Sequence, residues 1–392
     1  LALLKARGLT TSLYAGAEDD EETSALALFS VTVELTEAGL ADVDGVVCVV
    51  LGALGSLARR PAERWVYDEM QLIASLRFRF AQHEDELEYA RRLALGMQHR
   101  PPPDELLTTD VLLREFAPHL VADVLAALTP ASCSAYVVAA DDRCHEIEPW
   151  FETSFAADAV PPARLARWQA AYDGADAAAF ALPVPNTFLP SDFALRHERK
   201  EEDGAAAAAA AAAGAPRQPP PVLLSASSGG ALFHKPDARW GAPKAVVCLD
   251  VRLAGAGASP RSYLLTELAT LACLEALNEE LYAATVAGLH YDLGPSVHGV
   301  LLSVDGFSHK LSKLAATVCE AFAALGTSDV DAEVYARVKS ALELRLANSG
   351  FDAATLATTT RQRALDAAMP SAEELVAELG AASPAALRAH VR

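Results

Sequence analysis

The sequence predicts an α+β protein built from two related domains. Both halves of the chain contain stretches in which apolar residues alternate, as in a half-buried strand. Both also contain longer stretches that repeat apolar residues every three or four positions, as in a helix. A low-complexity segment separates the halves. We therefore expect one domain over residues 1–193, a linker over residues 194–235 and a second domain over residues 236–392.

The segment between the halves differs in composition from everything around it. It begins with charged residues at 199–203, continues with alanines at 205–213 and ends in prolines up to Pro221. Such a stretch buries too little apolar area to offset the entropy lost on ordering. An alanine run this short forms at most a marginal helix in water, so we expect an exposed, mobile linker.

In the first half, a strand rich in β-forming residues is expected at 24–35, followed by a long amphipathic helix. Thr36 suits the N-cap of this helix, and the apolar residues from Leu40 to Leu57 recur at three- and four-residue steps. Proline is favoured in the first turn of a helix, which places the start of the next helix at Pro61. The remaining elements expected here are a helix near 110–128 and a strand at 134–139.

The second half repeats this order of strand and helix, although the pattern alone leaves open whether the chain arose by duplication. Alternation predicts a strand at 244–253, and helical spacing predicts a helix at 262–282. Residues 286–293 and 297–304 alternate on either side of Gly294-Pro295-Ser296, which predicts a hairpin that turns at those three residues. The helices expected after it lie near 309–324 and 331–348, with Asp329 or Asp331 as N-cap.

Composition excludes two classes of partner. The chain has 52 acidic and 32 basic residues and a formal net charge of −20 at pH 7, whereas binding a phosphate backbone needs clustered Lys and Arg. We therefore expect no nucleic acid partner. The longest strongly apolar stretch runs only from Val46 to Leu57, while a helix needs about 20 residues to cross a bilayer, so we expect no membrane span.

Six cysteines are scattered through the chain without a Cys-x-x-Cys pair. This spacing indicates buried thiols in a reducing compartment rather than disulfides or a zinc knuckle. A redox or metal-binding module built on these residues would need the paired thiol spacing that is missing. The cysteines are Cys48, Cys133, Cys144, Cys248, Cys273 and Cys319.

The motifs that mark common active sites are missing from the sequence. His-x-x-Glu-His and His-Glu-x-x-His, which place two zinc-binding imidazoles and a Glu on one helical face, do not occur. His83 and His145 each precede acidic residues without a second His at ligand spacing, which favours exposed, charged segments. The stretch 227–230 lacks the Lys and the strand–helix context of a phosphate loop, and no Gly-x-Ser-x-Gly elbow occurs.

Several collinear segments together resemble one family. The most specific is Pro185–Phe193, Pro-Asn-Thr-Phe-Leu-Pro-Ser-Asp-Phe, which is similar to the family's Asn-x-Phe-Ile-Pro-Thr-Asn-Phe. On these segments the chain resembles the insulin-degrading-enzyme (insulysin) branch, which includes nardilysin, of the M16 (insulinase, pitrilysin) zinc metallopeptidases. The resemblance covers nearly the whole chain. The other matching segments are 4–9, 12–13, 33–40, 78–80, 168–169, 232–237, 243–245, 277–284 and 287–293.

The resemblance implies four related α+β domains, each an antiparallel sheet covered by helices, that close around a chamber in which peptides are cut. The chain would be the middle portion. Residues 1–193 would form most of the second domain, incomplete at its N-terminus, and residues 236–392 most of the third, incomplete at its C-terminus. In this family the first domain holds His-x-x-Glu-His and a distal Glu. The implied cofactor is therefore zinc with ligands outside this chain, and no catalytic or metal residue is assigned here.

One substrate site is also implied, at Leu13, Tyr14, Ala15, Gly16 and Ala17. The family uses this strand edge as an exosite that pairs with the N-terminal segment of the substrate. Ala15 and Ala17 stand where the family has Gly and Gln, so the expected pairing uses the backbone rather than those side chains. The alternative is an ordinary strand.

The other matching segments have structural explanations. Asn186–Phe193 is expected to be an ordered turn that docks the last strand of the N-terminal half, with direct substrate contact as the alternative. Asn278, Tyr282, Gly288 and Tyr291 are expected to form the corner between a helix and the hairpin, with Gly288 supplying an unusual backbone angle. The hairpin is a candidate for the chamber wall.

These observations favour the non-catalytic central portion of an insulin-degrading-enzyme-like zinc metalloendopeptidase. The alternative is a catalytically inactive M16 relative that acts as a scaffold or peptide-binding module, and His-x-x-Glu-His upstream would favour the enzyme. The expected partners are peptide substrates, the remaining M16 domains and a second copy of the protein in a homo-oligomer. We expect a cytoplasmic location, with organelle targeting left open because a chain that starts at Leu1 is expected to be a piece of a longer protein.

Overall fold

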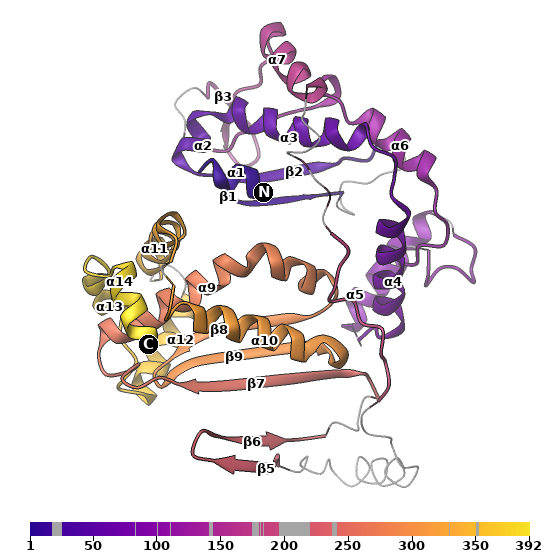
Figure 1. Cartoon of the computed structure of the whole chain (residues 1–392). Coiled ribbons are helices and arrows are strands. Elements are labelled where there is room, and N and C mark those ends of the chain that lie inside the picture. The colour runs from indigo at the N-terminus through magenta and orange to yellow at the C-terminus, as the bar shows by residue number, and fades with distance from the viewer. Residues whose placement is uncertain are drawn as a thin grey trace. The chain divides into compact units, whose positions relative to one another are not determined.

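The chain divides by its contacts into two units, each of which mixes helices with small antiparallel sheets. The first unit is made of Leu1–Leu72 and Leu112–Pro185, and the second of Ile73–Val111 and Asn186–Arg392. Both appear in the cartoon of the computed structural model (Figure 1), and the predicted α+β class is confirmed. The structure describes residues 1–17, 26–82, 84–99, 101–109, 111–140, 144–174, 180, 182, 184–195, 220–236, 241–328, 330–349 and 353–392.

The domain boundaries expected from the sequence stay a prediction, because a division by contacts does not by itself test them. The second unit takes in residues 73–111 and the segment from Asn186, which the sequence placed in the first domain. Within the predicted linker, residues 196–219 lie outside the described residues. Val222–Ser227 (β5) and Gly230–His234 (β6) form an antiparallel hairpin at the end of that predicted linker.

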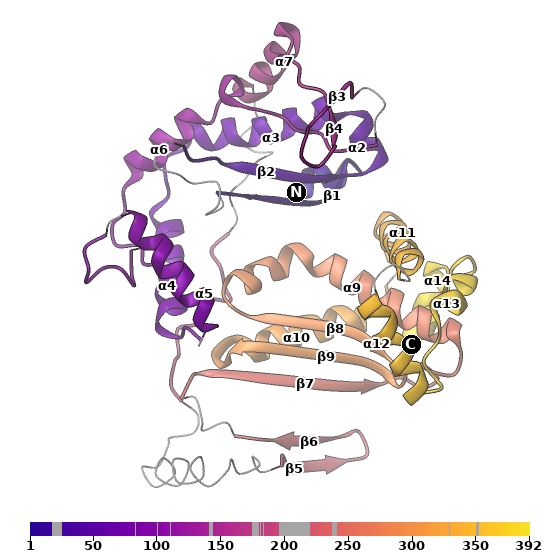
Figure 2. The same cartoon turned by 180° about the vertical axis from the view of Figure 1, so that it is seen from behind.

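The first unit contains a two-stranded antiparallel sheet, Thr10–Gly16 (β1) with Ser30–Leu35 (β2), in which Leu13 lies opposite Val33. Val43–Ala58 (α3) and Pro162–Asp173 (α7) pack against each other beside it, as both views show (Figures 1 and 2). The other elements of this unit are α1 (Ala2–Ala6), α2 (Glu37–Ala41), the first part of α4 (Arg64–Arg79), α6 (Pro118–Ala127), the short 3-10 helix η3 (Pro130–Ser132), and the paired short strands β3 (Glu146–Ile147) and β4 (Ser154–Phe155).

Two capping residues divide the long helix expected after the first strand. Thr36 caps α2, because its hydroxyl accepts the N–H of Gly39 at 3.0 Å, as predicted. Asp42 then leaves the helical backbone conformation and caps α3 by accepting the N–H of Gly45 at 3.0 Å. The prediction of one continuous helix is therefore wrong. The apolar spacing continues across the break, so it does not reveal that Asp42 ends one helix and begins the next.

The packing of α3 on α7 requires a glycine. A Cβ added at Gly55 would lie 2.1 Å from the carbonyl oxygen of Tyr172, whereas one added at Gly52 has its nearest neighbours at 3.4 Å. Trp168 of α7 is 2% exposed, and its Nε1 donates to Asp44 Oδ1 at the start of α3 at 3.3 Å. The two helices approach so closely that position 55 has no room for a side chain.

We expect Gly55→Ala to destabilise the chain by about 1–3 kcal/mol, because the added methyl group meets a backbone carbonyl that cannot move without shifting α7. Gly52→Ala on the same helix is the matched control. It is expected to be neutral or slightly stabilising, since Ala has the better helix propensity. Urea unfolding of the full chain, followed by circular dichroism, gives the comparison, and equal midpoints for the two variants would contradict this account of the packing.

The second unit contains a three-stranded antiparallel sheet in the order β7 (Lys244–Arg252), β9 (Gly299–Phe307) and β8 (His290–Ser296). The helices α9 (Pro260–Val286) and α10 (Ser308–Ala324) contact this sheet. Seen from behind, the central part of the sheet has no helix in front of it (Figure 2). The remaining elements are the end of α4, α5 (Glu86–Gly96), η2 (Met97–His99), β5, β6, α11 (Ala332–Asn348), α12 (Ala353–Leu365), α13 (Ala372–Leu379) and α14 (Pro384–Val391).

Most elements predicted for the second half are confirmed, but the hairpin turns at another place. β8 runs through Gly294 and Pro295 to Ser296, so the turn falls at residues 297–298. Proline is tolerated because β8 is an edge strand, where a missing N–H interrupts no ladder. The turn requires Gly299, which has φ 150° and would place a Cβ 2.1 Å from the carbonyl oxygen of Val251. Gly294-Pro295 is typical of a turn in sequence, but in the structure both residues lie within an edge strand.

The strand predicted at 134–139 is wrong, since these residues form no strand. Tyr136 is 90% and Val138 99% exposed, so the alternation that predicted the strand has neither a partner strand nor a covered face among the described residues. Helix starts were also placed too early. α4 begins at Arg64 rather than Pro61, and α6 begins at Pro118 rather than near residue 110.

Candidate functional site

The five residues expected to form a substrate exosite lie at the edge of the first unit's sheet. Leu13 to Gly16 end β1, and Ala17 follows the strand. Ser12 donates to Glu34 Oε2 of β2 at 2.7 Å and helps hold the register. In the described part of the chain, β2 is the one strand paired with β1. An antiparallel strand points every second N–H and C=O away from its partner, so the outer edge of β1 can accept an added strand.

The side chains at this edge supply little specific chemistry. Tyr14 is 56% exposed, Ala15 and Ala17 are exposed, and Leu13 is half-buried. A Cβ at Gly16 would lie 3.2 Å from the hydroxyl of Tyr14, so this tyrosine lies back over the glycine. Residues 18–25 lie outside the described residues. Recognition through the backbone is what the geometry of this edge allows, and the exosite itself stays a prediction.

A second group of family-like residues, Asn186–Phe193, forms a docked turn in the second unit. Asn186 Nδ2 donates to the carbonyl oxygen of Ala283 on α9 at 2.7 Å, and Asn186 Oδ1 accepts the N–H of Phe188 at 2.9 Å. The side chain of Phe188 is 3% exposed. The ordered turn expected here is therefore confirmed, while the described residues 184–195 contain no strand leading into it.

The first turns of α10 hold the other end of this docked turn. His309 Nδ1 lies 3.1 Å from the backbone N of Ser191 and 3.3 Å from that of Asp192, and it accepts from both. One helical turn further on, the ammonium group of Lys313 lies 4.5 Å from the centroid of the Phe188 ring. The sequence analysis assigned no role to His309 or Lys313. The sequence places both residues at the start of a predicted helix, but this position does not predict which groups they contact.

Three aromatic rings join the docked turn to the rest of the second unit. The centroid of Phe193 lies 6.0 Å from that of Phe80 at the end of α4 and 5.9 Å from that of Phe307 at the end of β9. Phe80 and Phe307 lie 5.5 Å apart, edge to face. The ammonium group of Lys244 lies 5.5 Å from the centroid of Phe307, and the guanidinium of Arg79 lies 5.1 Å from that of Phe80. Such contacts add to the apolar area that the rings bury.

We expect Asn186→Ala to lower the free energy of unfolding by about 1–3 kcal/mol, because the carbonyl oxygen of Ala283 and the N–H of Phe188 each lose a hydrogen-bond partner. Asn278→Ala removes the same amide from an exposed site on α9, where surface substitutions change stability by less than about 0.5 kcal/mol. Chemical unfolding of the full chain measures both. A loss for Asn278→Ala as large as that for Asn186→Ala would show that the docked turn is not what Asn186 stabilises.

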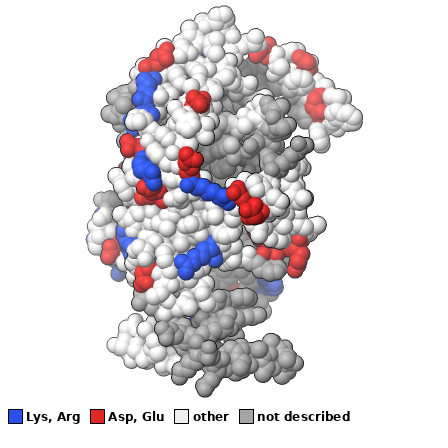
Figure 3. Space-filling view, turned by 90° about the vertical axis from the view of Figure 1, so that its right-hand side faces the viewer, with Lys and Arg blue, Asp and Glu red and all other residues white. Residues whose placement is uncertain are grey.

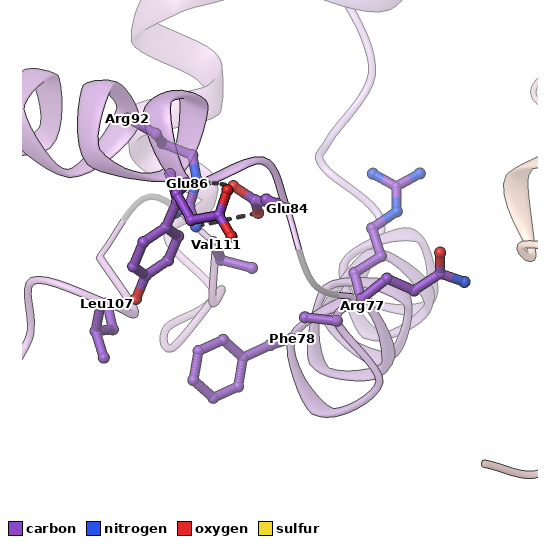
Figure 4. A pocket seen from close by; sticks show the side chains of 10 residues that line it. Arg77, Phe78, Glu84, Glu86, Arg92, Leu107 and Val111 are labelled. Atoms are coloured by element: carbon purple, nitrogen blue, oxygen red, sulfur yellow. Dashed lines mark hydrogen bonds and ion pairs between the residues drawn. The ribbon is translucent and has the colours of Figure 1, made fainter. Parts of the chain in front are cut away.

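The second unit also has a hollow of about 560 Å³ between the end of α4, the start of α5 and residues 107–111. Phe78 and Leu107 face this space in Figure 4, whereas Arg77 points away from it. Glu84 and Arg92 close one side through two hydrogen bonds of 3.2 and 3.3 Å. Its described lining combines apolar residues such as Phe78 and Leu107 with charged ones such as Glu84, Glu86 and Arg92, and it includes no Ser, Cys or His. This lining by itself identifies no reaction.

Charged side chains of both signs are interspersed on the face of the molecule that Figure 3 shows. The structure also has exposed ion pairs within single helices, such as Arg64–Asp68 at 2.8 Å and Arg91–Glu88 at 3.0 Å. Exposed pairs of this kind add little stability, and mixed signs create no strong local field. Charge on this face therefore identifies no binding site.

Among the described residues, no three His, Cys, Asp or Glu side chains lie close enough together to hold a metal ion. His145 lies 3.8 Å from Glu146, and both are exposed, as predicted for this segment. His83 lies outside the described residues. In the described part of the chain, no helix is both long and apolar enough to span a membrane.

The six cysteines are free thiols. The expectation that they are buried is right for Cys273 and wrong for Cys248, which is exposed on β7. Burial raises the pKa of Cys273 to about 12, with a smaller contribution from Cys319. A thiol with so high a pKa is almost entirely protonated at pH 7, which makes Cys273 a poor nucleophile.

The described residues thus form small antiparallel sheets flanked by helices, with one edge of β1 unpaired among them. A family model described as the middle or third domain of peptidase_M16 matches residues 78–378. The chain belongs to the M16 peptidase family.

The comparisons with single proteins agree with this assignment. The chain is 29% identical over 354 residues to the insulin-degrading enzyme of Homo sapiens, covering 89% of this chain and 32% of that protein. It is 26% identical over 319 residues to nardilysin of Rattus norvegicus, covering 80% of this chain and 26% of that one. A crystal structure of pitrilysin matches the fold with a TM-score of 0.71 at 19% identity, over 100% of this chain and 39% of that chain. The chain thus spans about a third of the length of these relatives.

Proposed function

We propose that this chain is the non-catalytic central portion of an insulin-degrading-enzyme-like zinc metalloendopeptidase. The observation that supports this most directly is the continuous similarity to insulin-degrading enzyme over 89% of this chain and 32% of that protein. The chain would supply part of the chamber wall and an exosite, while the rest of a longer protein supplies the chemistry. Peptides are then the substrates, and the remaining M16 domains are the partners. For the location we propose the cytoplasm, which the unpaired cysteine spacing favours.

The residues of this chain do not fit a catalytic zinc ion. The sequence lacks His-x-x-Glu-His and His-Glu-x-x-His, and the described residues bring no three metal-binding side chains together. A zinc peptidase site needs three protein ligands and an open position for water. The zinc ligands and the general base of the proposed enzyme therefore belong to other domains, and this chain's contribution is binding and enclosure.

We expect the 392-residue chain alone to bind no stoichiometric zinc and to cleave no peptide, whereas the full-length protein does both. Metal analysis by inductively coupled plasma spectrometry and a fluorogenic peptide assay with and without chelator test the two proteins side by side. Tight zinc and chelator-sensitive cleavage by the chain alone would refute the non-catalytic role. A full-length protein that binds peptide but never cleaves it would favour the alternative, an inactive scaffold or peptide-binding module.

The exosite part of the proposal is supported by the geometry of β1. In the described residues β1 is paired along one edge, Ala15 and Gly16 near its end have little or no side chain, and Ala15 is exposed. A peptide that adds as a strand to such an edge gains main-chain hydrogen bonds, each worth about 0.5–1.5 kcal/mol net. Loss of one or two of them corresponds to roughly tenfold in affinity.

We expect Ala15→Pro in the full-length protein to weaken peptide binding about tenfold, because proline removes an N–H and disturbs the geometry of the strand. Ala15→Ser keeps the N–H and is the matched control, with affinity close to that of the wild type. Fluorescence anisotropy of a labelled peptide measures all three proteins after circular dichroism has shown that each is folded.

The peptide itself provides a second control. A peptide trimmed at its N-terminal segment has nothing left to pair with β1, so wild type and Ala15→Pro should bind it equally. If the full peptide also binds both proteins equally, residues 13–17 are an ordinary strand and the exosite is not part of this protein's function.

A further inference from the structure

The turn between β3 and β4 in the first unit presents two large aromatic side chains, Trp150 and Phe151, to solvent. Trp150 is 87% and Phe151 88% exposed. The two short strands pair with each other and with no further strand among the described residues. Single apolar side chains on a surface are common, but two adjacent aromatic rings form a patch of the kind that marks an interaction site. We call these two residues the aromatic tip.

Hydrogen bonds hold the aromatic tip in one conformation. The carboxylate of Glu148 accepts the N–H of Trp150 at 3.0 Å with Oε2 and the N–H of Phe151 with Oε1. The N–H of Glu148 donates to the carbonyl oxygen of Thr153 across the turn at 3.0 Å. Glu152 has φ 55°, a left-handed angle that is uncommon for residues other than glycine. A turn that is already ordered loses less entropy when its side chains bind a partner.

The charges around the aromatic tip indicate which partner it fits. Residues 141–163 contain six acidic residues and one basic residue. Tryptophan is favourable at a bilayer interface, but anionic lipid headgroups repel so acidic a segment. A second copy of the chain has the same net charge of −20, so long-range repulsion opposes that pairing as well. The chemistry fits a protein surface that has an apolar pocket with Lys or Arg at its rim.

The length of the relatives indicates where such a surface belongs. The match to insulin-degrading enzyme covers 32% of that protein and leaves about two thirds of it outside. We propose that the aromatic tip docks into an apolar pocket with a basic rim on another domain of the full-length protein. This contact rests on the proposed function only in that the chain is the central portion of a longer protein. A full-length protein without zinc or peptidase activity would keep it.

Hydroxyl-radical footprinting with mass spectrometry tests this contact, because a side chain is oxidised faster the more it is exposed to solvent. Trp150 and Phe151 should be oxidised fast in the 392-residue chain alone. In the full-length protein they should be oxidised about fivefold more slowly or less, since aromatic anchors of an interface are fully desolvated. Trp168, which is 2% exposed, should be oxidised slowly in both proteins. Equal rates for the aromatic tip in the two proteins would overturn the proposal.

Other partners would give different results, and each of these results would overturn the proposal. Slow oxidation of the aromatic tip in a dilute solution of the chain alone would show that another part of this chain covers it. Protection that grows with the concentration of the chain alone would assign the tip to a second copy. Protection of the full-length protein only after a peptide is added would assign it to substrate, and protection only after phosphatidylcholine–phosphatidylserine vesicles are added would assign it to a membrane.

A variant shows whether the two rings dock together. In full-length Trp150→Ala the pocket loses its larger ring, so Phe151 should be oxidised nearly as fast as in the chain alone. Leu87→Ala removes another largely exposed apolar side chain, from α5, and should leave both rings of the aromatic tip protected. Circular dichroism confirms that each variant is folded. Full protection of Phe151 in Trp150→Ala would contradict docking through the aromatic tip.

A second pair of variants tests whether the ordered turn positions the rings. Glu148→Gln replaces one carboxylate oxygen with an NH₂ donor, so one of the two N–H groups loses its acceptor. Trp150 and Phe151 should then be oxidised faster in the full-length protein. Glu146→Gln removes the same charge from β3, outside the turn, and should leave them protected. Equal rates in these two variants would show that Glu148 acts through its charge and would overturn its role as a positioning residue.

Discussion

The burial of α9 is the constraint on which the second unit depends. Leu264, Leu268 and Leu281 are 0% exposed, because the sheet and the helices α10, α11, α13 and α14 all pack against this one helix. A helix covered on so many sides has apolar residues nearly all round. Not every polar atom that it buries is paired, since Glu267 Oε2 has no hydrogen-bond partner among the described residues. Glu267 forms an ion pair with Arg345 of α11; burial raises the pKa of Glu267, and the guanidinium of Arg345 opposes that shift. The docked turn at residues 186–193 begins on the same helix, where Asn186 Nδ2 donates to the carbonyl oxygen of Ala283.

Signals that act over one turn of chain were sufficient to predict several features. Thr36 and Asp331 cap helices as expected, the latter by accepting the N–H groups of Glu333 and Val334 at 2.8 and 3.0 Å. Gly288 has φ 76°, as expected for the corner after α9. These predictions succeed because a cap or a left-handed angle depends on the residue and its immediate neighbours. They would hold in almost any tertiary context.

The predictions that failed depend on what lies across space. The stretch 134–139 has the alternation of a strand, but a strand exists only where another one pairs with it. Gly294-Pro295 has turn chemistry, but it lies on an edge strand where proline does no harm. Among the site residues, the edge at Leu13 to Ala17 came from resemblance to a family rather than from chemistry. The role of His309 was out of reach, since its partners are backbone groups more than a hundred positions away in the chain.

The hairpin of β5 and β6 affects how the isolated chain behaves in concentrated solution. Leu223, Leu232 and Phe233 are each more than half exposed on this hairpin, and flat strand edges with apolar side chains invite pairing between copies. The net charge of −20 opposes such encounters through long-range repulsion. Salt shortens the range of that repulsion to about 8 Å at physiological ionic strength. Concentrated solutions of the isolated chain should therefore associate less, and be less turbid, in dilute buffer than in saline, which is the reverse of salting-in.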